Sequence, residues 1–242
     1  MPTYGKGTGL VGYNVQTAVD TGTHLIVAHE VTNVGNDRAQ LAPMARAAKA
    51  ALEAETLEAI ADRGYFNGAE LLACHGEGIT ATVPRPETSG NRKKGMFVKA
   101  DFAYDAGSDV YRCPAGKLLS YRYTTEEDGL MLRRYWQNEC QRCPLQSRCT
   151  TGKERRITRW EHEHLVEAMY ARMDRDPALM RRRRSTVEHP FGTIKAWMGA
   201  THFQMRRLGN VRTEMALHVL AYNIKRMIGL LGVGPLLNAI RI

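Results

Sequence analysis

The sequence predicts an α/β protein in which helices flank a mixed β-sheet. Residues 12–20 alternate apolar and polar side chains, and a second β-rich run follows at residues 24–32 after a Thr-Gly-Thr turn, which predicts a hairpin. Helical spacing of apolar residues follows from residue 38, and two short apolar runs come next, at residues 57–61 and 79–83. The resulting order, β-β-α-β-α-β, is typical of an α/β sheet with mixed strand directions.

Each predicted helix of this first part begins at a capping residue. Asp37 precedes a helical pattern that runs to about residue 54, and Asn67 precedes a second one at residues 68–75. Both side chains accept hydrogen bonds well at a helix N-terminus, so we expect Asp37 and Asn67 to be N-caps.

The pattern changes at residue 84. Short strand-like pieces at residues 98–104, 110–113, 118–123 and 130–136 predict a β-rich insertion. Helical periodicity returns from residue 162, and Asp176-Pro177 predicts the start of a further helix. We therefore expect the first part of a catalytic core in residues 1–83, the insertion in residues 84–159 and a helical part of the core in residues 160–242, including a last helix at about residues 211–230.

Charge and hydropathy narrow the class of partner. The 242 residues carry a net charge of +9 and are 43% hydrophobic, which favours a packed domain with a polyanionic partner. No run approaches the roughly 18 apolar residues of a membrane span, and no apolar stretch follows Met1 as in a signal peptide. The expectation is a soluble, cytoplasmic protein.

The most strongly charged stretch is residues 181–195, which opens with four arginines. On an ideal helix of about 100° per residue, Arg184, Glu188 and Lys195 fall within about 40° of one another. A solvated basic helix and a helix that binds DNA phosphate are the two interpretations of this pattern.

Asp62 and Glu188 are the candidate catalytic acids. Asp62 ends an apolar strand before Arg-Gly, and acids at such strand ends often carry chemistry in α/β folds. Two carboxylates brought together can hold Mg²⁺. The alternative for Asp62 is a turn-forming or salt-bridge role.

Four cysteines of the insertion have metal-ligand spacing. Cys140-x2-Cys143 is followed closely by Cys149, and Cys113 lies upstream, so the set predicts a structural Zn²⁺ site. Free thiols and redox use remain alternatives. Cys74 lies on a predicted helix, where we expect it in the core.

The motifs together resemble the DDE transposases of bacterial insertion sequences. Ala61-Asp-Arg-Gly-Tyr65 and Arg184-x3-Glu188-x6-Lys195 are similar to the second and third acidic motifs of this family, in its branch with a Tyr-Arg-Glu-Lys signature. The resemblance extends to Gly12–Asp20, Gly35–Asp37 and Leu220–Arg226. It implies an RNase H-like (retroviral integrase superfamily) fold and Mg²⁺- or Mn²⁺-dependent DNA cleavage and strand transfer, performed by a dimer on DNA.

The resemblance also implies individual roles. Asp62 and Glu188 match metal-binding acids, and Arg184 and Lys195 match positions that contact DNA near the cleaved end. Arg181 stands where the signature has tyrosine, and an arginine can still bind phosphate.

The first acid of the family has no match. It belongs to a first strand upstream of the hairpin, and this sequence starts just before the hairpin. Asp20 would lie at the opposite edge of the sheet from Asp62, so we expect it in the hairpin turn. Asp37 matches a family position, and capping is the role expected of it. The sequence thus predicts a transposase core without its first strand and first metal ligand; a catalytically inactive DNA-binding fragment is the alternative.

Overall fold

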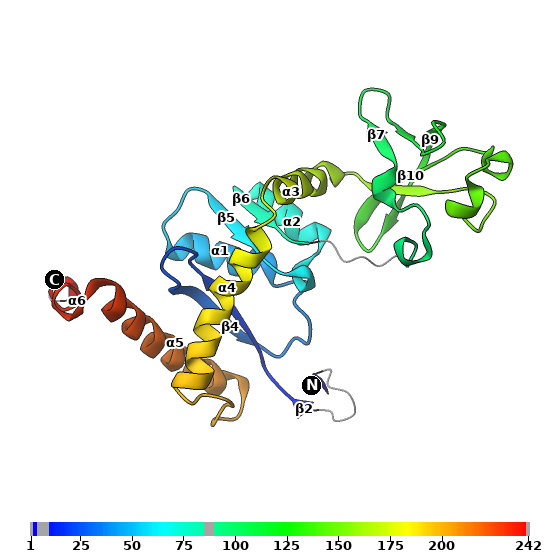
Figure 1. The fold of residues 1–242 in the computed structure, drawn as a ribbon. Coiled ribbons are helices and arrows are strands. Elements are labelled where there is room, and N and C mark those ends of the chain that lie inside the picture. The colour runs from blue at the N-terminus through cyan, green and yellow to red at the C-terminus, as the bar shows by residue number, and fades with distance from the viewer. Residues whose placement is uncertain (1, 4–9, 85–89, 241–242) are drawn as a thin grey trace. The chain divides into compact units, whose positions relative to one another are not determined.

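The computed structural model describes residues 2–3, 10–84 and 90–240 (Figure 1). The chain divides into two compact units. Unit 1 is made of residues 1–84 and 169–242, and unit 2 of residues 85–168.

The hairpin of unit 1 forms as predicted. Strands β3 (Asn14–Val19) and β4 (Ile26–Thr32) are antiparallel, and Asp20 accepts hydrogen bonds from the backbone N–H and the hydroxyl of Thr23 at 2.7 and 2.6 Å in the turn between them. Asp20 is therefore a turn residue.

A second, parallel pair contains the next two strands. Helix α2 (Gly68–Gly76) connects β5 (Leu57–Ile60) to β6 (Ile79–Thr82), and Asn67 caps α2 by accepting from the N–H of Ala69 at 3.0 Å. The expected single mixed sheet is not continuous: among the described residues, β3–β4 and β5–β6 are separate two-stranded sheets.

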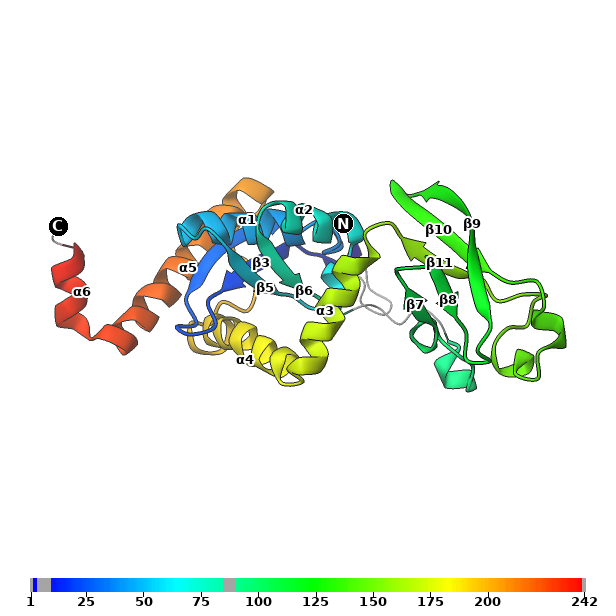
Figure 2. The same ribbon diagram turned by 90° about the horizontal axis from the view of Figure 1, so that it is seen from above.

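Helices lie on both sides of these strands (Figure 2). Helix α1 (Leu41–Ala51) begins later than predicted, and its N-cap is Gln40 rather than Asp37. Helix α4 (Leu179–Gly192) likewise has Ala178 at its N-cap rather than Asp176. The remaining elements assigned wholly or partly to unit 1 are β1 (Pro2–Thr3), β2 (Leu10–Val11), α3 (Glu163–Arg175), a π-helical turn (Thr193–Trp197), α5 (Leu208–Leu231) and α6 (Val233–Ile240).

The main core of unit 1 joins the hairpin to α5. Ile26 and Val31 of β4 pack with Val211, Met215 and other buried residues of α5. Polar groups fix this contact: the Asn223 side chain bonds both the N–H and the carbonyl of Ile26, at 3.0 and 2.9 Å. The buried apolar surface stabilises the contact between α5 and β4. The Asn223 hydrogen bonds leave no unpaired backbone group at Ile26.

Unit 2 is a five-stranded antiparallel sheet around an aromatic core. Asp109 links two core tyrosines by accepting from the hydroxyls of Tyr104 and Tyr135, each at 2.7 Å. Only the end of the predicted strand 98–104 is extended, because Asp101 accepts from the N–H of Val98 and closes a 3₁₀ turn. The strands, in the spatial order β11-β10-β9-β8-β7, are β7 (Ala103–Asp105), β8 (Val110–Arg112), β9 (Leu118–Glu127), β10 (Leu130–Trp136) and β11 (Ile157–Trp160).

Across the described part of the chain, every helix is too short or too polar to cross a membrane.

Candidate active site

Asp62 lies where β5 ends and a 3₁₀ turn (Arg63–Tyr65) begins. One carboxylate oxygen, Oδ1, accepts from the N–H of Gly64 at 2.8 Å, and the other, Oδ2, pairs with Arg183 of α4 at 3.0 Å. Both roles weighed as alternatives to catalysis, turn former and salt-bridge partner, are therefore present. The Asp62 side chain is 46% exposed, so solvent still reaches it.

Asp37 is a second carboxylate beside the Asp62 turn. The sequence did not predict that Asp37 would lie there. Its Oδ1 accepts from the side chains of Asn14 and Gln16, each at 2.7 Å, and the Tyr65 hydroxyl donates to Gln16. Burial, and then the negative charges of Asp37 and Asp62, raise the pKa of Tyr65. The tyrosine therefore stays protonated and can remain a donor. The capping role expected of Asp37 is wrong because these β3 amides occupy its carboxylate.

Gly64 separates the two acids. A Cβ atom at this position would lie 3.1 Å from Oδ1 of Asp62 and 3.4 Å from Oδ2 of Asp37. Contacts this short require neighbouring atoms to move, so the absence of a side chain at Gly64 lets both carboxylates approach the turn. The available signal was the Asp-Arg-Gly motif itself, which places glycine two residues after the strand-end acid.

Glu188 points away from the Arg183–Asp62 pair. Five residues separate Glu188 from Arg183 on α4, which is a rotation of about 140° on an α-helix. Glu188 instead lines a groove of about 520 Å³ with residues that include Trp197 and Lys225. Glu188 and Arg183, the partner of Asp62, therefore lie on different faces of α4.

The predicted DNA-binding cations are all exposed. Arg184 keeps 75% of its side-chain surface accessible, and its Nε lies 4.0 Å from Glu188, as the shared helix face predicted. Arg181 and Lys195 are also exposed.

Lys195 does not share that face. It lies in the π-helical turn after α4, where each residue turns the chain by less than in an α-helix. Its ammonium lies 5.8 Å from the Phe191 ring centre, and it lines a different cavity from Glu188. The prediction from an ideal helix was wrong here because the helix changes type at residue 193.

Metal-ligand geometry is not formed at the acids. Among the described residues, no three His, Cys, Asp or Glu side chains are arranged to hold a metal ion. The donor chemistry of Asp37, Asp62 and Glu188 suits a hard cation such as Mg²⁺. Arg183 now neutralises Asp62, so a cation there would compete with the guanidinium.

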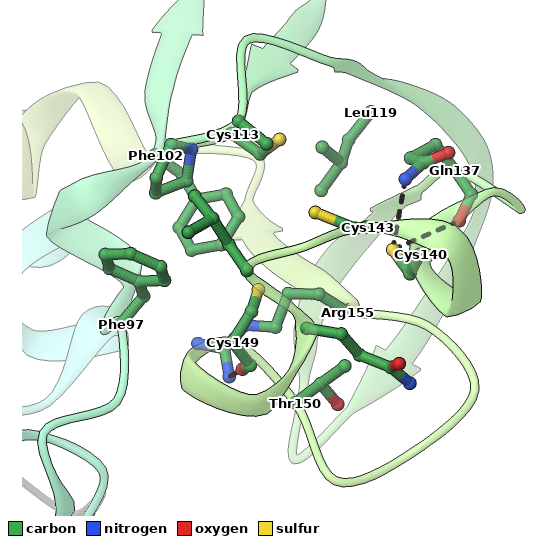
Figure 3. Close-up of a pocket in the computed structure, with 14 residues that line it drawn as sticks. Phe97, Phe102, Cys113, Leu119, Gln137, Cys140, Cys143, Cys149, Thr150 and Arg155 are labelled. Atoms are coloured by element: carbon green, nitrogen blue, oxygen red, sulfur yellow. Dashed lines mark hydrogen bonds between the residues drawn. The ribbon is translucent and has the colours of Figure 1, made fainter.

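The four cysteines of unit 2 gather around one small cavity (Figure 3). The cavity is lined by Cys113, by Cys140 and Cys143 of one 3₁₀ turn and its cap, and by Cys149, and all four are free thiols. Burial raises the pKa of Cys149, and the other three thiols add smaller contributions in the same direction. They share one site, although their present arrangement is not that of a metal centre.

One comparison with known proteins matches part of the chain to a family model. A family model described as a transposase DDE domain matches residues 112–228. No curated protein and no solved structure matches the chain. The matched region contains Arg184, Glu188 and Lys195 and leaves Asp62 outside it. By this match, residues 112–228 are similar to the transposase DDE domain.

Proposed function

We propose that this protein binds transposon and target DNA and catalyses divalent-metal-dependent strand cleavage and strand transfer. The observation that carries the proposal, beside the family match, is the contact between the strand-end acid Asp62 and the arginine-rich helix α4. An acid that can hold a cation and a helix that can hold phosphates are thereby joined in one unit. Divalent cations and DNA backbones are the partners that this pairing suits.

The chain's own residues have separable tasks in this proposal. Asp62 and Glu188 would hold Mg²⁺ or Mn²⁺, and Asp62 would then exchange its ion pair with Arg183 for the cation. Arg181, Arg184 and Lys195 bind phosphates of the strand to be cut, because their exposed cations can neutralise a polyanion. The metal, when bound, activates the attacking hydroxyl and stabilises the leaving oxygen.

A second candidate is a DNA-binding protein without catalytic activity. It is favoured by the arrangement described, in which Glu188 and Asp62 lie apart and Arg183 occupies Asp62. Both candidates predict that DNA affinity falls steeply with salt. Only the first predicts metal-dependent cleavage.

The deciding experiment is nicking of supercoiled DNA in Mg²⁺ or Mn²⁺ by wild type, Glu188→Gln and Asp62→Asn. We expect nicking that chelation stops and that both substitutions abolish, with DNA binding retained. Arg181→Gln and Arg184→Gln should each reduce the slope of log affinity against log salt by about 1. Salt-sensitive DNA binding without any nicking would instead establish the inactive DNA-binding protein.

We also propose a structural Zn²⁺ site in unit 2. The cysteine cavity holds four thiols, the number that a tetrahedral zinc site needs. A shared small cavity supports such a site, with modest rearrangement of the side chains around it.

A further inference from the structure

Residues 199–207, which lead into α5, end in two adjacent arginines. We call this segment the arginine loop. Arg206 and Arg207 are both exposed, and neither has an ion-pair partner in the part of the chain that the structure describes. By contrast, Arg212, a short way along α5, pairs with Glu30 at 2.6 Å. Two adjacent guanidinium groups without an acid suit an anion from outside the chain.

Arg207 has a backbone conformation that a side chain rarely permits. Its φ is 70° and its ψ is 141°, close to a region that glycine alone adopts readily. The sequence nevertheless has arginine at this position. Residues strained in this way persist where the surrounding contacts hold them, and they cluster at sites that bind ligands.

Glu214 of α5 holds the arginine loop from the inside. Its Oε1 accepts from the N–H of Gln204 and its Oε2 from the N–H of Met205, each at 2.8 Å. The Glu214 residue is only 7% exposed. Burial alone would raise the pKa of Glu214, but the two backbone donors bring it below its ordinary value. A buried carboxylate therefore anchors the loop just before its arginines.

Two further contacts fix the ends of the loop. Phe203 packs against the main core of unit 1, and its ring lies edge-on to that of Tyr13 at 6.3 Å. After the arginines, the N–H of the fully buried Val211 donates to the carbonyl of Arg207 at 3.0 Å. The backbone on both sides of Arg206 is thus fixed before any ligand binds, which lowers the entropy lost on binding.

The arginine loop and Lys195 border the same cavity, which has a volume of about 330 Å³. Its polar lining includes Lys195, Thr201 and His202, and also His218, whose Nε2 lies 3.7 Å from Oε1 of Glu214. An anion that contacts Lys195 therefore lies beside the loop. A DNA strand can contact both, because it carries one negative charge per about 3.4 Å of its length.

We propose that Arg206 and Arg207 bind phosphates of the DNA strand that Lys195 contacts, and that Glu214 is the positioning residue that holds the loop for this contact. The inference rests on the proposed function for the identity of the polyanion. It adds two phosphate contacts and their anchor to the residues named there.

The test measures anisotropy of a fluorescein-labelled DNA duplex at several salt concentrations, with chelator and without divalent cation. Arg206→Gln and Arg207→Gly should each weaken binding about tenfold and lower the slope of log affinity against log salt by about 1. Arg206→Lys keeps the charge and should retain most of the affinity. The matched control is Arg46→Gln, which removes the same charge from α1, where Arg46 pairs with Glu77 at 2.6 Å. It should change the slope much less.

Arg207→Gly separates binding from folding. Glycine adopts the backbone conformation of residue 207 readily, so this variant should melt about 2–4 °C higher than wild type while it binds DNA more weakly. Unchanged DNA binding in this variant would show that the arginine makes no phosphate contact.

Glu214→Gln tests the anchor against simple electrostatics. The substitution removes a negative charge, so charge alone predicts tighter DNA binding. A loosened loop predicts weaker binding, by about tenfold. If Glu214 acts through the loop, Arg206→Gln should cost less affinity in the Glu214→Gln background than in wild type. Equal costs in the two backgrounds, or tighter binding by Glu214→Gln, would overturn the positioning role.

The loop contacts are wrong if wild type does not bind the duplex, or if Arg206→Gln and Arg207→Gly, both folded by circular dichroism, bind it with the wild-type affinity and salt slope. The measurement does not depend on cleavage. Weaker binding by these variants of a protein that never nicks DNA would contradict strand cleavage alone. Nicking by wild type, with normal DNA binding in the variants, would contradict the loop alone.

Discussion

Gly64 is the residue on which the geometry of the two neighbouring acids depends. In Gly64→Ala, the new methyl group would meet both carboxylates at 3.1 and 3.4 Å. We expect a loss of about 1–3 kcal/mol in the free energy of unfolding, as for overpacked sites. DNA cleavage should fall as well, because Asp62 must move.

The matched control is Gly35→Ala, whose added Cβ meets nothing within 4 Å. Chemical denaturation of the two variants gives the comparison. Equal stabilities would show that the turn adapts freely and that Gly64 does not hold the acids in place.

Only some of the residue roles could be predicted from the sequence. The strand-end motif identified Asp62 and also its two structural alternatives, because a carboxylate before Arg-Gly favours a turn. The contact with Arg183 was not predicted, since it depends on how α4 lies against β5, some 120 positions earlier in the sequence. Asp37 was misassigned because local spacing suggests a cap, whereas two amides of β3 bind it in space.

At the scale of elements, α4 was predicted and its continuation was not. Periodicity places Arg184 and Glu188 on one face, and their proximity follows from regular α-helical geometry. The π-helical turn has no clear signature in the apolar pattern, although the Met198 N–H bonds to Thr193 O at 3.1 Å, five residues back. This single change of helix type moves Lys195 away from the face of Glu188.

The cysteine cavity of unit 2 yields a prediction at the same scale. Protein purified under reducing conditions should contain about one zinc ion per chain by elemental analysis, since four thiols complete a tetrahedral site. Cys140→Ser should lose most of it. Cys74→Ala is the control, because Cys74 is buried in unit 1 and its thiol pKa is raised by burial to about 11, which disfavours the thiolate that a metal binds.

A folded, metal-free wild type would contradict the zinc site. Equal zinc loss from the Cys140 and Cys74 variants would point to binding outside the cavity.

At the scale of the molecule, the sequence predicted an α/β core and a β-rich insertion, and the structure has both kinds of architecture. It predicted strands well because alternation and turn residues are local signals, as in the hairpin of β3 and β4. It could not predict that β3–β4 and β5–β6 would form separate strand pairs among the described residues. Which strands become neighbours depends on pairing between distant segments, and local periodicity carries no information about that pairing.

The central claim is that Asp62 and Glu188, apart in the structure described, share one divalent cation when the protein acts. The most direct measurement replaces Mg²⁺ with Fe²⁺ and generates hydroxyl radicals at the bound ion, so that the backbone is cut beside its ligands. We predict that cuts appear near both residue 62 and residue 188, that excess Mg²⁺ suppresses them together, and that Glu188→Gln removes both. Cutting at only one of the two positions, or cutting that Mg²⁺ does not suppress, would contradict the shared site.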